Sequence, residues 1–155
     1  MAACARQPEL EETRFLNFDA ESSSDALLTG WSGFERTEAG DTFSWVQSRL
    51  AVVRVQTRVD GDRLLRFRAW AFRYPQAPEQ TVTLIVNGSR LESFPLDEKP
   101  RVFSAVAPAA AFHPGTNELA LEFAYAEAPR DRLPGSGDVR TLAAAFDWLE
   151  VLPPA

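Results

Sequence analysis

The chain has 155 residues, of which 45% are hydrophobic and 11% aromatic, and its 22 acidic and 16 basic residues give a formal net charge of −6. This length fits one domain that buries roughly two thirds of the surface of its unfolded chain, and the apolar content is too high for a disordered protein. The negative charge argues against nucleic acid as a partner. No run approaches the roughly 20 apolar residues of a membrane helix, so we expect the body of the chain to be soluble and not membrane-spanning.

The amino-terminal segment contains the single cysteine. Met1-Ala2-Ala3-Cys4 resembles the end of a bacterial lipoprotein cleavage site, although the apolar stretch that precedes such a site is missing from the sequence. Two interpretations stay open: Cys4 is a lipidation site in a chain that begins late, or the similarity is due to chance. We predict that residues 1–12 are a flexible lead-in and that residues 13–155 form a single domain.

The first half of the predicted domain contains two strands and a loop between them. Residues 13–20 alternate in polarity and predict the first strand. Residues 27–45 combine glycines with aromatics and predict a shaped loop. Residues 48–59 predict a long strand with a shift of facing that indicates either a bulge or a segment buried on both faces. Asp60-Gly61-Asp62 then predicts a hairpin turn.

Residues 63–74 predict a strand with two contrasting faces. Its core face carries four apolar residues: Leu65, Phe67, Ala69 and Ala71. Its other face is both cationic and aromatic: Leu64, Arg66, Arg68, Trp70 and Phe72. That second face is interpreted either as a ligand groove or as a sheet surface covered by the loop at residues 138–140. We favour the covered surface, because exposing Trp and Phe together leaves an apolar patch.

The second half of the chain continues with strands and short turns. Asn87-Gly88 is the strongest hairpin signal in the sequence. Strands are predicted on both sides of it and beyond it, at residues 81–86, 90–96, 101–107, 118–126 and 142–151. In the last of these, Trp148 is predicted to face the core and Asp147 the opposite side. About eight strands without a long helix predict an all-β antiparallel sandwich or barrel.

The landmarks TVTLIVNG, PGTN, ELALEF and FDWLEV, in this order, resemble those of the galactose-binding-like jelly rolls that serve as carbohydrate-binding modules. The pattern covers roughly residues 27–151. It is also similar to accessory domains of bacterial cell-envelope glycosyltransferases and sulfatase-like transferases. The resemblance implies a jelly-roll sandwich that binds or presents a glycan in the extracytoplasmic cell envelope, in the periplasm or on the outer surface. A lipid anchor would follow if Cys4 is acylated, and a cytoplasmic location stays open.

The sequence shows no catalytic constellation. His113 is the single histidine and stands beside Pro114 in a turn, which excludes a two-histidine metal site within one chain, and there is no Gly-x-Ser-x-Gly motif. We therefore predict a non-catalytic protein without a cofactor. The resemblance implies one exception, a structural calcium ion, for which Asn17, Asp19 and Asp147 are the candidate ligands.

Aromatic side chains are the best candidates for ligand binding. Sugar rings stack their apolar C–H faces on aromatic rings, and polar side chains bind their hydroxyls. The candidate binding residues are Trp31, Trp45, Arg68, Trp70, Tyr74, Asp138 and Arg140. Core packing is the competing interpretation for each tryptophan, including Trp31, and a structural ion pair or turn cap is the competing interpretation for Asp138 with Arg140. The alternative function is a structural or protein-interaction domain that docks on an envelope complex without binding sugar, so the partner is a glycan or an envelope protein. Neither the sugar nor the oligomeric state follows from the sequence.

Overall fold

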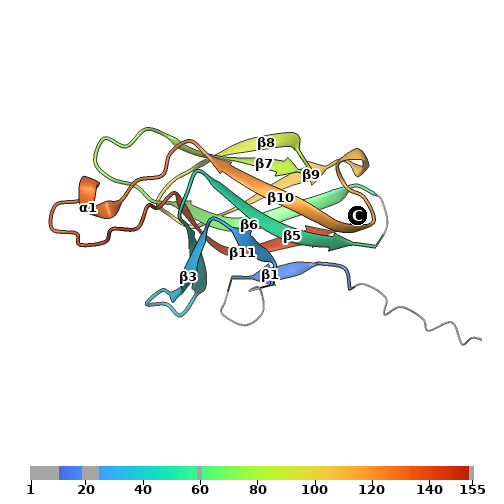
Figure 1. The fold of residues 1–155 in the computed structure, drawn as a ribbon, viewed down its shortest axis with the longest axis horizontal. Coiled ribbons are helices and arrows are strands. Elements are labelled where there is room, and N and C mark those ends of the chain that lie inside the picture. The colour runs from blue at the N-terminus through green and yellow to red at the C-terminus, as the bar shows by residue number, and fades with distance from the viewer. Residues whose placement is uncertain (1–10, 19–24, 59–60, 154–155) are drawn as a thin grey trace, which may run out of the picture.

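The chain forms two antiparallel β-sheets that pack face to face, in a computed structural model that describes residues 11–18, 25–58 and 61–153 (Figure 1). Cys4, Asp19 and most of the predicted lead-in lie outside these described residues. The described part is almost entirely strand and turn, so the predicted all-β antiparallel sandwich is confirmed. No helix in this part is long and apolar enough to cross a membrane.

Sheet A has the strand order β3-β4-β11-β6-β9, with β1 also beside β11. Its strands are β1 (Phe15–Asn17), β3 (Trp31–Arg36), β4 (Thr42–Val46), β6 (Arg63–Ala71), β9 (Arg101–Ala107) and β11 (Ala144–Leu152). Strand β11 pairs with β6 on one side, while β4 and β1 share its other side. The last strand of the chain therefore occupies the centre of this sheet.

Sheet B has the strand order β2-β5-β10-β7-β8. Its strands are β2 (Leu27–Thr29), β5 (Leu50–Thr57), β7 (Gln80–Val86), β8 (Ser89–Leu96) and β10 (Gly115–Phe123). Two short helical segments complete the described part, η1 (Ala109–Ala111) and α1 (Pro129–Arg132). Helix α1 lies at one end of the sandwich, which we call the loop end (Figure 1).

The core lies between the two sheets and follows the alternation of the strands. The predicted core face of β6 is confirmed, since Leu65, Phe67 and their two alanine neighbours are buried. Phe146 of β11 lies at the centre, with its ring 5.7 Å from that of Phe67 and 6.2 Å from that of Phe123 on the opposite sheet. Burial of these rings, together with the aliphatic side chains around them, drives the two sheets to close on each other.

Two turns that the sequence singled out meet at the end opposite the loop end. The Asn87-Gly88 turn joins β7 to β8, and both residues have positive φ (46° and 85°), as a tight hairpin requires. Asn117 of the PGTN turn is buried, and its side-chain oxygen accepts a hydrogen bond from the Asn87 side chain at 2.7 Å. Its amide nitrogen donates to Thr57 and to the His113 carbonyl. The polar Asn117 is thus buried at low cost because its hydrogen bonds are made.

Three sequence predictions about the strands were wrong. Residues 27–45 form β2, β3 and β4 rather than a loop, so there are eleven strands in the described part instead of about eight. A register shift between Trp31 and Phe34 breaks the strict alternation that would have revealed β3. Strands β5 and β6 lie in different sheets, so the predicted hairpin between them does not form; Asp60 of the predicted turn is outside the described residues. Strand β5 alternates regularly and pairs with β10 without a shift, whereas its pairing with β2 is irregular, with Leu27 opposite Val53 and Thr29 opposite Val52.

A bulge occurs instead in β11. Phe146 lies opposite Ala69 and Trp148 lies opposite Arg68, so Asp147 is one extra residue in the strand. Because of this extra residue, the side chains of β11 after Asp147 alternate between the two faces in the opposite order from those before it. Trp148 therefore lies on the outer face, with the Arg66 guanidinium 5.9 Å from its ring centre, and the prediction that it faces the core was wrong.

Candidate functional site

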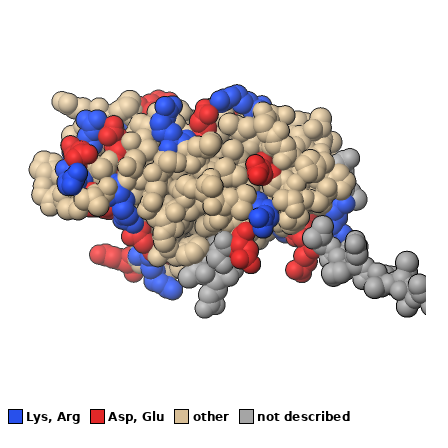
Figure 2. Space-filling model, in the orientation of Figure 1, with Lys and Arg blue, Asp and Glu red and all other residues tan. Residues whose placement is uncertain are grey.

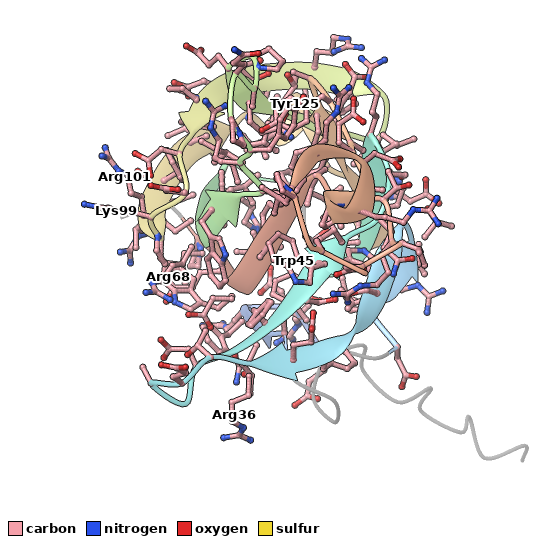
Figure 3. All side chains as sticks on the ribbon, turned by 90° about the vertical axis from the view of Figure 1, so that its left-hand side faces the viewer. Arg36, Trp45, Arg68, Lys99, Arg101 and Tyr125 are labelled. Carbon is pink, nitrogen blue, oxygen red and sulfur yellow. The ribbon has the colours of Figure 1, made fainter. Side chains whose placement is uncertain are left out.

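Six aromatic side chains outside the main core form a continuous row, which we call the aromatic row. It runs over the outer face of sheet A to the loop end. Successive ring centres are 5.2 to 6.4 Å apart in the order Trp70, Phe43, Trp45, Phe72, Tyr74 and Tyr125. None of the six belongs to the hydrophobic cluster between the sheets. Figure 3 looks onto the loop end and labels Trp45, Arg68 and Tyr125.

Strand register places the two tryptophans on either side of β11. Trp45 of β4 and Trp70 of β6 both lie opposite Ala145, whose side chain is small and fully buried. Two strand spacings of about 4.8 Å each separate their backbones. Phe43 stands two residues before Trp45 on the same face, and its ring contacts both indoles. The result is a patch on three neighbouring strands in which the buried Phe43 supports two half-buried indoles.

The row contains three polar groups that are free to bind a ligand. The indole nitrogens of Trp45 and Trp70 and the hydroxyl of Tyr74 have no hydrogen-bond partner among the described residues, and none of these atoms is enclosed by protein. All three side chains are half-buried, so their edges reach solvent. By contrast, the Tyr125 hydroxyl donates to the Phe72 carbonyl, and burial raises the pKa of the Tyr125 phenol.

Charged groups border the row on β6 and β11. The guanidinium of Arg68 lies 6.0 Å from the ring centre of Trp70 and forms an ion pair with Asp147, with Asp41 3.9 Å away. Burial raises the pKa of Asp147, the hydrogen bond from Arg68 opposes that shift, and the nearby charge of Asp41 adds to it. Two carboxylates against one guanidinium leave this part of the face slightly acidic.

At the loop end the row reaches a hollow of about 430 Å³, lined by Arg73, Tyr74, Pro75, Asp97, Glu98 and Leu133. A second hollow of about 360 Å³ shares Arg73 and Asp97 with it. Arg132 of α1 lies 5.1 Å from the ring centre of Tyr74 and pairs with Glu127. Basic and acidic side chains lie side by side at this end of the molecule (Figure 2). A ligand on the row would therefore meet polar groups of both signs here.

Gln80 fixes the long segment between β10 and β11 in place. Its side chain is fully buried, and its amide donates to the carbonyls of Tyr125 and Ala143 at 2.8 and 3.1 Å. Its side-chain oxygen accepts from the backbone of Ala124 and Tyr125. One side chain of sheet B thereby holds both ends of the segment, and with them the Tyr125 end of the row.

The structure brings together four of the seven predicted binding residues: Trp45, Arg68, Trp70 and Tyr74. Trp31 lies elsewhere. Its ring packs 5.0 Å from that of Phe18 and 5.7 Å from that of Phe146, and its nitrogen donates to the Val52 carbonyl. Core packing, the competing interpretation, describes Trp31.

Asp138 and Arg140 form the ion pair that the sequence suggested, at 2.8 Å. Arg140 also pairs with Glu35 of β3 at 3.2 Å, so the loop is tied to the β3 edge of sheet A. Hydrogen bonds to Asp138 and Glu35 raise the pKa of Arg140 and hold it charged. The cover that we expected this loop to provide over Phe72 comes from the rings of Trp45 and Tyr74.

Sequence reasoning missed Phe43 and the acidic partners of Arg68. Phe43 and Trp45 are two residues apart, which places them on the same face if the segment is a strand. Because residues 27–45 were predicted to be a loop, this relation was overlooked. Of the calcium candidates, Asp147 pairs with Arg68, Asn17 lies opposite Trp148 in the sheet, and Asp19 is outside the described residues. The described residues contain no group of three or more His, Cys, Asp or Glu side chains placed to hold a metal ion. Calcium binding stays a prediction.

Comparison with known proteins identifies the fold. No protein-family model matches the sequence, and a search of curated proteins found no match. Among solved structures, a CBM35 module from Cellvibrio japonicus has a TM-score of 0.58 at 14% identity, with 90% of this chain and 95% of that chain covered.

Two further modules resemble this chain. A CBM35 module solved with a disaccharide containing glucuronic acid has a TM-score of 0.58 at 13% identity, covering 92% and 95% of the two chains. A CBM6 module from Clostridium stercorarium, solved with cellobiose, has a TM-score of 0.52 at 13% identity, covering 94% and 100%. The chain therefore has the β-sandwich fold of carbohydrate-binding modules.

Proposed function

We propose that this protein is a non-catalytic carbohydrate-binding module that takes a glycan on the aromatic row. The observation that carries the proposal is the pair Trp45 and Trp70, two half-buried indoles on the outer face of sheet A whose nitrogens have no hydrogen-bond partner among the described residues. Partly exposed aromatic rings with free donors at their edges suit a ligand that has both apolar faces and hydroxyl groups. A sugar ring has both.

The row can bind a sugar chain along its length. The half-buried rings of Trp45 and Trp70, supported by the buried Phe43, would lie against the C–H faces of sugars, and the two indole nitrogens would donate to hydroxyl or ring oxygens. Arg68 and Asp41 at one margin, and the Tyr74 hydroxyl at the loop end, supply further partners for hydroxyls. Such polar contacts fix the orientation of a chain that stacking alone would let slide.

Charge favours a neutral glycan over an anionic one. Asp41 and Asp147 outnumber Arg68 at the site, and the whole chain carries a formal charge of −6. A uronate placed against this face would be repelled by the net charge, although salt would screen part of that repulsion. Neutral oligosaccharides should therefore bind more tightly than their carboxylated counterparts of equal length.

Titration calorimetry with neutral and uronic hexasaccharides tests the proposal. Replacing Trp45 or Trp70 by Ala should weaken binding at least about tenfold, because hot-spot aromatic contacts are worth more than about 1 kcal/mol. Trp148→Ala is the matched control, since Trp148 is a half-buried indole on the same face but outside the row. A folded protein that binds no glycan, or that loses affinity equally in all three variants, would disprove the proposal.

Two parts of the proposal rest on the sequence resemblance. The absence of catalysis is proposed from that resemblance; two of the acidic residues, Glu35 and Glu122, are held in ion pairs with Arg140 and Arg90. Incubation with the bound oligosaccharide should release no shorter products. A place in the bacterial cell envelope is proposed from the resemblance and from Cys4. If no glycan binds, docking on an envelope protein through the same aromatic face becomes the leading function.

A further inference from the structure

Strand β9 differs from the other edge strands of the two sheets. The sheets end at β3 and β9 and at β2 and β8, and an unprotected edge invites pairing with another chain. Strand β2 has three residues and a register shift. Strand β3 has a shift and ends in Glu35-Arg36, and β8 has a shift together with charged residues and Pro95. Each of these strands carries features that discourage pairing.

Strand β9 has little such protection. Its seven residues pair with β6 without any shift, and after Arg101 its sequence is VFSAVA, with neither charge nor proline. Val102 and Val106 are 49% and 64% exposed and stand on the outer face, two residues to either side of Ser104. They are two of the five large apolar side chains that are exposed in the described part of the chain. This edge is therefore regular, uncharged and apolar.

We propose that β9 pairs antiparallel with β9 of a second copy of this chain, with the twofold axis at Ser104. In that register Val102 lies opposite Val106 of the partner subunit, and the reverse contact follows from the symmetry. Apolar cross-strand pairs of this kind stabilise antiparallel sheets. In an isologous interface each contact is repeated by the twofold axis, and the spacing Val-x-Ser-x-Val makes both repeated contacts valine on valine.

The charges near the two ends of β9 are balanced within one chain. At its start, where Figure 3 labels Lys99 and Arg101, Arg101 forms an ion pair with Asp97 at 2.9 Å and Glu98 precedes Lys99. At its far end the carboxylate of Asp62 accepts the backbone N–H of Ala109, and Arg63 lies opposite Ala107. Neither end therefore carries a cluster of like charge that would repel a second copy.

This dimer would join the two copies of sheet A into one sheet. Because neighbouring strands of a sheet share its faces, both aromatic rows would lie on the same side of that sheet. If the rows bind glycan as proposed above, a long polysaccharide could contact both, and its apparent affinity would exceed that of one row through effective concentration. The pairing itself does not depend on glycan binding.

Sedimentation velocity of the full chain without glycan tests the pairing. We expect a dimer that dissociates on dilution. Val106→Lys should weaken it more than about tenfold, because it leaves a lysine facing an apolar partner and buries its charge in the seam. Val139→Lys is the matched control, since Val139 is 63% exposed and lies outside every strand. A wild-type chain that stays monomeric at high concentration, or equal weakening by both variants, would overturn the proposal.

Cross-linking tests the register. In a Cys4→Ala background, Ser104→Cys places two thiols near the twofold axis, and a short bis-maleimide should yield a covalent dimer. The same treatment of Val139→Cys should leave monomers. A dimer that sediments as such but does not cross-link at position 104 uses another surface and would disprove the pairing. Since no glycan is present, either failure leaves the proposed glycan site untouched.

Discussion

The outer faces of the two sheets differ, although the inner faces are built alike. On sheet B, the outward residues of β7 are Thr81, Thr83 and Ile85, and the neighbouring β10 carries Glu122, which pairs with Arg90. On sheet A, Trp45 and Trp70 occupy the corresponding outward positions. Both faces belong to strands with the same apolar inner alternation.

The difference shows which part of the sequence specifies the fold and which part is available for function. A sandwich needs one apolar face on each sheet, and sheet B satisfies this with polar residues outside. Sheet A keeps large aromatic rings outside as well, at the cost of exposing apolar surface to water. Folding of the sandwich alone does not require aromatic rings on the outer face of sheet A. The half-buried indoles of Trp45 and Trp70 are therefore the part of the aromatic row that packing explains least. Four comparisons of paired variants test how the row is held and how the two outer faces differ.

The largest effect is expected where sheet B supports the row. Gln80→Leu removes the side chain that holds Tyr125 and Ala143, and it leaves several backbone groups buried without partners. We expect a loss of about 4 kcal/mol in the free energy of unfolding, since each unsatisfied group costs about 1–3 kcal/mol. Denaturant unfolding measures it. Gln56→Leu, which breaks the contact with Thr116 on the outside of sheet B, should cost less than about 1 kcal/mol. Equal losses would contradict the supporting role of Gln80.

The second effect concerns the centre of the row. Phe43→Ala removes a ring that contacts both Trp45 and Trp70, and we expect it to cost about 3 kcal/mol of stability. Ile85→Ala on the outer face of sheet B should cost about 1 kcal/mol, because Ile85 is only half-buried. Thermal unfolding compares the two variants. If Ile85→Ala lowered the melting temperature more than Phe43→Ala, Phe43 would not be a packing centre of the aromatic row.

A smaller effect is expected at the loop end. Tyr125→Phe deletes the buried hydroxyl that donates to the Phe72 carbonyl and should cost about 1.5 kcal/mol. Thr83→Val breaks the exposed hydroxyl contact with Ser93 on sheet B and should cost less than about 0.5 kcal/mol. Since burial raises the pKa of Tyr125, an ultraviolet titration should also show one tyrosine ionising above the usual 10.0, and this step should be missing from the Tyr125→Phe variant. A wild-type protein in which no tyrosine ionises above the usual pKa would contradict the burial of the Tyr125 hydroxyl.

The smallest effects are opposite pH dependences on the two faces. Burial raises the pKa of Asp147 above 3.8, so the folded protein takes up a proton first and the contribution of Asp147 to stability falls as pH rises through that window. The hydrogen bond from Arg90 lowers the pKa of Glu122 below 4.5, so its contribution is present above pH 4.5 and is lost as pH falls through the lowered pKa.

Variants separate these two contributions. As pH falls from 7 towards 3.8, the stability of the wild type relative to Asp147→Asn should rise, whereas below pH 4.5 its stability relative to Glu122→Gln should fall. Unfolding by denaturant across this pH range measures both differences. The same sign for both variants would show that Asp147 is not governed by burial.

The fold could be predicted from the sequence because its signals are local. Two-residue alternation specified the core face of β6, and the positive φ demanded of Asn87-Gly88 specified a hairpin. The site was only partly predictable. Trp45 and Trp70 become neighbours through β11, a strand about a hundred residues after β4 in the chain, and no local pattern reports which strand lies between them. The extra residue Asp147 was equally hidden, because a bulge changes the facing of Trp148 without changing the composition.

Gln80 has a consequence for how this protein could be diversified. The segment between Tyr125 and Ala143 begins and ends on one fixed side chain, and a bridge between Glu127 and Leu142 closes its base. The contacts that bring the two ends of this segment together therefore do not depend on how long the segment is. Doubling the length of a flexible loop costs only about 0.6 kcal/mol. The segment can be exchanged or enlarged while the sandwich below it is kept, which makes it the natural place to insert a library of new recognition sequences.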